Sequence, residues 1–501
     1  MKVTVLDTTL RDGTQGEAVS FTVDDKLVIA RKLDEFGIDY IEGGYPGANP
    51  VDTKFFEKPP ATKACFTAFG MTKRAGVSAS NDPGLTALLQ AKSDAICFVA
   101  KSWDYHVEFA LGCTLDENLG SIRDSVAATL AANKRAMIDC EHFFDGYKAN
   151  PDYALACART AYEAGARWVV LCDTNGGTLP DEVGAIVREV AKTVPGDNLG
   201  IHAHNDTGVA VANTLAAVEA GCVHVQGTIN GFGERCGNAD LCTVIPNLEI
   251  KMGYKALANG DLSMLTETSV YVGEIANLRP NSQAPYVGSS AFAHKAGMHV
   301  SAMLRNGATY QHVQPELVGN EMRVLISELS GRSNIVHKLT ELQLGFDLSP
   351  ERIASVAQQV KERESLGYEY EGAEGSFELL VRRGQPDYAP PFEVLDFMVL
   401  AEKRSGKEII SEATVKASVG GMPMHTAAEG DGPVNALDRA MRKALLPFYP
   451  ELGPVQLTDY KVRIIDPKSA TAAKTRVLID ASDGVRTWTT MGCSVNIIEA
   501  S

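Results

Sequence analysis

The chain has 501 residues, of which 45% are hydrophobic and 22% are charged, and its formal net charge is −16. This composition is typical of a globular protein with more than one domain, and the acidic balance argues against nucleic acid or an anionic membrane as the main partner. The first residues enter a strand pattern directly, unlike a signal peptide, and the ten cysteines form no Cys-x-x-Cys pair, which together predict a protein of the reducing cytoplasm.

Residues 2 to about 253 alternate between apolar runs and segments with helical periodicity. The apolar runs predict eight strands, at 3–7, 40–45, 64–70, 95–100, 136–144, 168–173, 199–205 and 224–230. Helices are expected between them, among them 23–36, 115–134, 152–164, 181–194 and 209–220. Eight such units over roughly 250 residues predict a closed (β/α)₈ TIM barrel. An open doubly wound sheet fits less well, because no Gly-x-Gly-x-x-Gly turn is present.

The remainder of the chain predicts two further regions. Residues 255–278 have a helical pattern, and 279–319 are irregular and contain histidines. Polar helices are expected at 321–345 and 350–366, followed by a linker at 367–391. Strand alternation then appears at 392–402, 411–419, 460–465, 474–481 and 486–492, with a helix at 433–446. We therefore expect an α/β barrel at 1–270, a helical linker region at 271–385 and an α+β regulatory or dimerisation domain at 386–501.

Metal-binding residue types recur where the barrel strands are expected to end. His202 and His204 are two apart on a strand and therefore point to the same side. Asp12 follows the first strand and supplies a carboxylate, and Asn238 follows the eighth and could supply an amide oxygen. Such a mixed set of nitrogen and oxygen ligands suits one divalent metal, with Mg, Mn, Zn and Co all acceptable. Two polar side chains on a solvated strand, or buried histidines with ordinary partners, are the plain alternative.

Three further side chains at the same rim have functional interpretations. Arg11 could bind a developing oxyanion, or it could form a structural ion pair. Glu141 could orient or deprotonate a substrate group, or it could be an exposed carboxylate at a strand end. Thr174 could donate to a substrate carboxylate, or its hydroxyl could cap a turn.

Three motifs resemble the signatures of the 2-isopropylmalate/homocitrate/citramalate synthase family. They are LRDGTQ at 10–15, HAHND at 202–206 and GFGERCGN at 231–238. The resemblance covers essentially the whole chain, and the segments at 41–50 and 173–178 are most similar to the members that use pyruvate. It implies that Arg11 contacts substrate and oxyanion, that Glu141 is an active-site carboxylate and that Thr174 contacts the 2-oxo acid. The implied metal ligands are Asp12, His202, His204 and Asn238.

The resemblance also extends to the region after the barrel. His299 coincides with a family histidine and Tyr310 with its catalytic tyrosine, although Val300 and Ser301 replace the usual Gln-Asp after that histidine. In the family this pair reaches the barrel of a neighbouring subunit, which implies a homodimer. The segments at 430–434 and 496–501 resemble the leucine- or isoleucine-sensing domain, so feedback control by either amino acid is expected.

The activity that the resemblance implies is a metal-assisted Claisen condensation of acetyl-CoA with pyruvate, giving citramalate and CoA for isoleucine biosynthesis. Tyr45 is expected to narrow the pocket in favour of pyruvate. The nearest alternatives use 2-oxoisovalerate, as in leucine biosynthesis, or 2-oxoglutarate. A lyase or aldolase on the same barrel is another alternative, but it would not need His299 and Tyr310. A barrel that serves only as an amino-acid sensor is the last alternative, and the presence of the metal-ligand residues argues against it.

Overall fold

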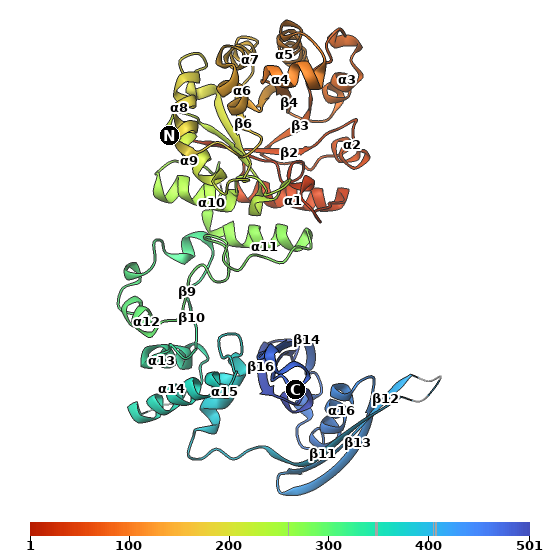
Figure 1. Cartoon of the computed structure of the whole chain (residues 1–501), viewed down its shortest axis with the longest axis vertical. Helices are drawn as coiled ribbons and strands as arrows, with labels where there is room; N and C mark the ends of the chain where they lie inside the picture. The colour runs from red at the N-terminus through yellow and green to blue at the C-terminus, as the bar shows by residue number, and fades with distance from the viewer. Residues whose placement is uncertain (259, 346–348, 404, 406–407) are drawn as a thin grey trace. The chain divides into compact units, whose positions relative to one another are not determined.

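The computed structural model describes residues 1–258, 260–345, 349–403, 405 and 408–501 (Figure 1). Two compact units are present: Met1–Phe292 with Val313–Glu321, and Ala293–His312 with Met322–Ser501. No helix in the described part of the chain is long and apolar enough to cross a membrane.

The first unit contains a closed barrel of parallel strands, which confirms the predicted fold class. The strands are β1 (Thr4–Asp7), β2 (Tyr40–Gly44), β3 (Cys65–Met71), β4 (Ala95–Lys101), β5 (Arg135–Glu141), β6 (Trp168–Asp173), β7 (Leu199–Ala203) and β8 (His224–Gly227). The barrel closes where β8 pairs in parallel with β1, with His224 opposite Thr4 and Gly227 opposite Asp7.

Helices follow the strands and cover the barrel (Figure 1). The larger ones are α1 (Val23–Phe36), α2 (Pro50–Glu57), α3 (Pro83–Gln90), α5 (Leu115–Ala131), α7 (Pro151–Glu163), α8 (Pro180–Val190), α9 (Ala210–Glu219) and α11 (Leu265–Ile275). Two of them begin at capping boxes, which satisfy free backbone amides of the first turn: Thr22 with Asp25 at α1, and Thr114 with Glu117 at α5. Helix α1 ends where Gly37 takes a left-handed conformation with φ 96°.

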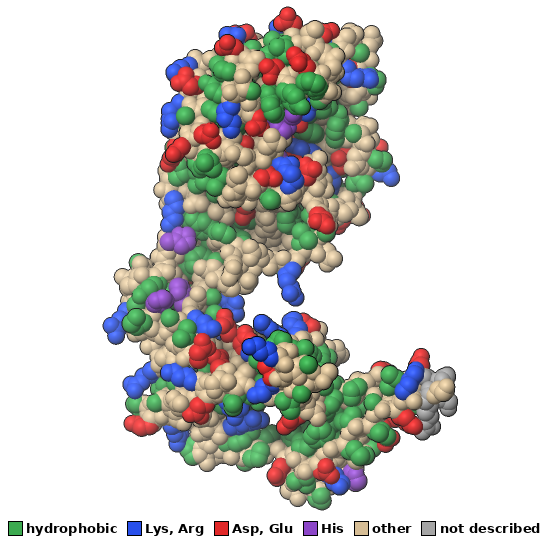
Figure 2. Space-filling view, viewed as in Figure 1, with side chains coloured by type: hydrophobic (Ala, Val, Ile, Leu, Met, Phe, Trp, Pro, Cys, Tyr) green, Lys and Arg blue, Asp and Glu red, His purple; other side chains and the backbone are tan. Residues whose placement is uncertain are grey.

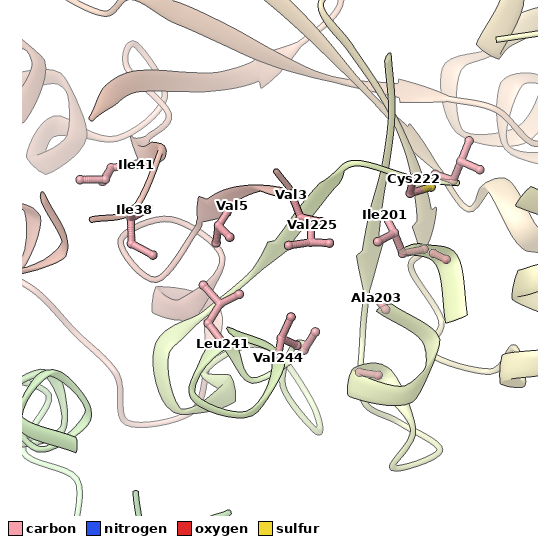
Figure 3. Packing of buried hydrophobic residues seen from close by; sticks show 14 of the residues in the cluster. Val3, Val5, Ile38, Ile41, Ile201, Ala203, Cys222, Val225, Leu241 and Val244 are labelled. Atoms are coloured by element: carbon pink, nitrogen blue, oxygen red, sulfur yellow. The ribbon is translucent and has the colours of Figure 1, made fainter. Parts of the chain in front are cut away.

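Side chains alternate between two cores along each barrel strand. Val3, just before β1, Val5 of β1 and Val225 of β8 face outward, and Figure 3 shows them near Leu241 and Val244 of α10 (Leu241–Pro246). Residues of the opposite parity fill the barrel interior: Leu6, Tyr40, Cys65, Ala95, Cys97, Met137, Trp168, Val170 and Cys172. The same parity continues to the carboxyl ends of the strands, where the inward-facing residues become polar.

Several predicted boundaries were wrong. The strand predicted at 136–144 ends at Glu141, because His142 adopts a left-handed φ of 55° and α6 (Phe143–Ala149) begins after it. The strand predicted at 224–230 ends at Gly227. The helix predicted at 321–345 is reduced to α13 (Arg332–Glu341), since 321–331 contains the short β10 (Arg323–Val324).

The second unit contains further helices and two antiparallel sheets. The helix α14 (Pro350–Ser365) agrees with expectation, whereas the predicted linker contains α15 (Glu374–Arg383). One sheet has the order β11 (Phe392–Lys403), β12 (Ile409–Val419) and β13 (Met422–Gly430), the last of which was not predicted. The other has the order β14 (Gln456–Ile464), β15 (Thr475–Ser482) and β16 (Thr487–Ser494). A helix follows each sheet, α16 (Pro433–Leu445) and α17 (Ile497–Ala500).

The first of these sheets has one covered face and one exposed face. Val415 and Ala417 of β12 are fully buried in a cluster with Ala436 and Ala440 of α16. On the other face, Met398 and Leu400 of β11 lie exposed opposite Thr414 and Glu412 of β12. Hydrophobic side chains gather over this sheet in Figure 2. An exposed apolar patch of this kind is typical of a surface that binds another protein.

Candidate active site

Three predicted metal ligands meet at the carboxyl end of the barrel. The Nε2 atoms of His202 and His204 lie 3.3 Å apart and face each other. The Oδ2 atom of Asp12 lies 3.2 Å from Nε2 of His202 and 3.9 Å from Nε2 of His204. All three side chains are buried. The three ligand atoms are therefore grouped closely enough to hold one metal ion.

Asn238 lies beside this group and has the free atom that a fourth ligand needs. It pairs with His204 in an isolated β-bridge, so the two residues are adjacent. Its Nδ2 donates to the carbonyl of Phe232 at 3.1 Å, and its buried Oδ1 has no hydrogen-bond partner among the described residues. A buried polar atom without a partner is costly, and a cation beside it would remove that cost. The donor set, two nitrogens and two oxygens, fits a divalent metal.

The pKa shifts of Asp12, His204 and His202 reflect both burial and the charges around them. Burial alone would raise the pKa of Asp12, but the Arg11 guanidinium and His202 hold it well below its usual range. Burial and the neighbouring His202 lower the pKa of His204 to about 4, so this ring is neutral at neutral pH. Burial would lower the pKa of His202, but its contact with Asp12 outweighs burial and raises it. The negative charge of Asp12 thus faces both rings, where a bound cation would balance it.

Arg11 is held rigidly at the edge of this group. Its Nε donates to Oε2 of Glu42 at 2.7 Å, and its NH1 lies 3.3 Å from Oδ1 of Asp12. The guanidinium carbon lies 3.8 Å from the ring centroid of Phe69. The Thr8 hydroxyl donates to the same Glu42 oxygen at 2.6 Å. Arg11 therefore presents a fixed positive charge next to the ligands, as an oxyanion-binding group requires.

Tyr45 lies close to the same aromatic contact. Its ring packs edge-on against Phe69, with centroids 5.9 Å apart, and its hydroxyl accepts from the Met71 amide at 3.3 Å. Tyr45 is therefore connected to Arg11 through Phe69, and it stays a predicted substrate contact.

Glu141 and Thr174 belong to a second polar group at this rim. Glu141 forms an ion pair with Lys101 at the end of β4. The Thr174 hydroxyl accepts from the His142 amide at 2.8 Å, and among the described residues its own hydrogen has no acceptor. His106, Glu141 and His142 are also grouped closely enough to hold a metal. The Lys101 ammonium already neutralises Glu141 there, so this group is less suited to a cation than the one around Asp12.

His299 and Tyr310 belong to the second unit. His299 lies on α12 (Gly297–Met303), and Tyr310 follows the turn Gly307–Thr309. Their rings stack with centroids 4.1 Å apart and an interplanar angle of 29°. Tyr310 is exposed and His299 half-buried. The two residues are therefore in direct contact with each other in the structure.

Sequence reasoning gave no role to four polar residues that contact the predicted site or lie one hydrogen bond behind it. They are Glu42, Lys101, Asp139 and Gln226. Each lies on a barrel strand and points inward, because it is two or four residues after an interior residue of the same strand. Those interior residues are Tyr40, Cys97, Met137 and His224. Counting every second residue from the apolar interior toward the carboxyl end of each strand would have found them.

Comparisons with known proteins divide the chain into three matched regions. Residues 2–272 match the HMGL-like family, 286–366 match the Homocitrate synthase post-HMGL domain-like family, and 371–501 match the LeuA allosteric (dimerisation) domain.

Curated relatives match along the full length. An (R)-citramalate synthase of Geobacter sulfurreducens is 52% identical over 100% of this chain and 95% of its own. Another, of Aquifex aeolicus, is 50% identical over 100% of this chain and 96% of its own. A probable 2-isopropylmalate synthase of Methanopyrus kandleri is 33% identical over 100% of this chain and 96% of its own.

Proposed function

The chain belongs to the HMGL-like family and, within it, to the (R)-citramalate synthases, and from this premise we propose how its own residues carry out the reaction. The reaction condenses acetyl-CoA with pyruvate and water and releases (R)-citramalate and CoA, so the enzyme is an acyltransferase. The observation that carries this assignment is the 52% identity with a synthase of this name over the whole chain. The relative named as a probable 2-isopropylmalate synthase, at 33% identity, makes 2-oxoisovalerate the second candidate acceptor.

The residues around Asp12 would position and activate the 2-oxo acid. A divalent metal held by Asp12, His202, His204 and Asn238 would polarise the ketone as a Lewis acid. Arg11, fixed by Glu42 and Asp12, would bind the oxygen that becomes an alkoxide. The Thr174 hydroxyl, which accepts from the His142 amide, would donate its own hydrogen to the substrate carboxylate.

Carbon–carbon bond formation needs a proton to leave the acetyl-CoA methyl group. The candidates for the base are Glu141, His299 and Tyr310, the last two supplied by a second subunit of a homodimer. The methyl carbon then attacks the ketone carbon, and the resulting alkoxide takes up a proton. Water cleaves the thioester and releases CoA. The stacking of His299 on Tyr310 supports a shared role, because it fixes both rings in one orientation.

The test is CoA release, followed with a thiol reagent, from acetyl-CoA mixed separately with pyruvate, 2-oxoisovalerate and 2-oxoglutarate. We expect release with pyruvate, its loss in EDTA, and its loss in Asp12→Asn. Asp39→Asn is the matched control, because Asp39 pairs with Lys2 near the amino end of the barrel. Release mainly with 2-oxoisovalerate would change the acceptor and keep the chemistry. No release with any acceptor would overturn the proposal.

The C-terminal region matches a domain described as allosteric and dimerising. We propose that it binds isoleucine, the end product of a pathway through citramalate, with leucine as the alternative effector. Isoleucine should lower the rate of CoA release and raise the melting temperature, because a ligand that binds only the folded state stabilises it. If neither amino acid changed the rate or the melting temperature, this regulatory role would be wrong.

A further inference from the structure

Three buried polar side chains form a chain of hydrogen bonds across the barrel interior. Nδ1 of His202, on β7, lies 2.8 Å from Oε1 of Gln226 on β8. Nε2 of Gln226 donates to Oδ1 of Asp139, on β5, at 3.0 Å. Exposure is 4% for His202, 1% for Gln226 and 4% for Asp139. This row of hydrogen bonds therefore ends at His202, a candidate metal ligand, and is shielded from solvent.

The direction of each hydrogen bond follows from the group at the far end. The NH₂ group of the Gln226 amide donates to Asp139, whose carboxylate oxygens accept. The amide oxygen of Gln226 must then face His202. Because that oxygen only accepts, Nδ1 of His202 has to carry a hydrogen.

The consequence lies on the other side of the ring. With the hydrogen on Nδ1, a neutral His202 has its lone pair on Nε2, which points toward Asp12 and His204. His204 has no such support, since its buried Nδ1 has no hydrogen-bond partner in the part of the chain that the structure describes. The two histidines are thus held differently.

We propose that Gln226 and Asp139 are positioning residues that fix the tautomer and orientation of His202 for metal binding. The proposal rests on the metal site proposed above and adds the groups that orient one of its ligands. Partners of this kind typically change metal affinity by about 10- to 100-fold. Asp139 is two hydrogen bonds away from the His202 ring, so its effect on the His202 tautomer passes through the Gln226 amide.

The experiment measures the dissociation constant of Co²⁺ for the full-length protein by calorimetry, together with the visible absorption spectrum of bound Co²⁺. Gln226→Leu removes both hydrogen bonds and should weaken Co²⁺ binding about 10- to 100-fold and alter the spectrum. Asp139→Asn can present either an oxygen or an NH₂ group to Gln226, so it should cause a smaller loss.

A double variant that combines Gln226→Glu with Asp139→Asn exchanges the acid and the amide. The amide introduced at position 139 can donate to the carboxylate introduced at position 226, and that carboxylate can accept from Nδ1 of His202. Affinity should therefore return toward the wild-type value, whereas a merely structural role predicts no such rescue. Asn118→Leu is the control: it removes an equally buried amide, 1% exposed, whose partners are the Lys101 carbonyl and the Tyr153 hydroxyl. It should leave Co²⁺ affinity unchanged.

The outcomes separate the two proposals. If wild type binds Co²⁺ and Asp12→Asn does not, while Gln226→Leu binds as wild type does, the positioning role is wrong and the metal site stands. If wild type does not bind Co²⁺, both fail. If Gln226→Leu does not fold, the comparison of Asp139→Asn with the double variant decides, and equal affinities in those two would overturn the positioning role.

Discussion

His224 offers a test of how burial inside the barrel determines stability. Its ring stacks on Trp168 with centroids 4.6 Å apart, and neither ring nitrogen has a hydrogen-bond partner among the residues the structure describes. Burial, with a smaller contribution from Arg167, lowers the pKa of His224 from 6.5 to about 3. We predict that His224→Phe, which keeps an aromatic ring against Trp168, removes an acid-dependent loss of stability.

The sign and size follow from proton linkage. Because the folded-state pKa lies below the unfolded-state value, the unfolded chain takes up a proton first, and stability falls as the pH drops from 6.5 toward 3. The expected loss in wild type, relative to neutral pH, is about 0.8 kcal/mol at pH 6 and about 2 kcal/mol at pH 5. His224→Phe lacks this contribution. Other buried groups, such as Asp7 with a pKa raised to about 7 by burial, are common to both proteins and cancel in the difference.

The assay is urea unfolding at pH 7.5, 6 and 5, followed by tryptophan fluorescence. Both proteins carry Trp488→Phe, because Trp488 lies in the second unit whereas Trp103 and Trp168 report on the barrel. The difference in unfolding free energy between the two proteins should widen toward acid by the amounts above. Equal pH dependence in both would refute the reasoning from burial.

Two further substitutions test the site. Arg11→Lys should lower kcat for CoA release about 100- to 1,000-fold, the usual cost of losing an oxyanion-binding donor, because lysine cannot reproduce both the Glu42 contact and the stack on Phe69. Steady-state kinetics with pyruvate check it, and an unchanged kcat would contradict the role of Arg11. Gly44→Ala should destabilise the barrel by about 1–3 kcal/mol, because Gly44 has φ +143° and an added Cβ would collide with the Asp52 carboxyl group. The Asp52 carboxylate accepts from the Tyr45 amide at 2.8 Å, so we also expect the KM for pyruvate to rise. Thermal unfolding and steady-state kinetics check both effects. A melting temperature and a KM equal to those of wild type would show that the backbone at Gly44 tolerates a side chain.

The sequence alone predicted the barrel and the residue types at its rim. Parallel strands in a closed barrel have all their carboxyl ends at one rim, so Asp12, His202 and His204 were expected to converge from distant segments, and in the structure they lie together. The family was also recognisable from these motifs, and the comparisons confirm it. Strand ends were predicted less well: the left-handed backbone of His142 ends β5 early, and no periodicity signals such a residue.

Only the tertiary structure decided how these side chains are held. Gln226 and Asp139 are 87 residues apart, and Arg11 and Glu42 are 31 apart, so neither pair forms a local pattern. Closure of the barrel brings each pair within hydrogen-bond distance and excludes water from it. The lowered pKa values of His204 and His224 have the same origin, because desolvation depends on what surrounds a ring in space and not on its neighbours along the chain.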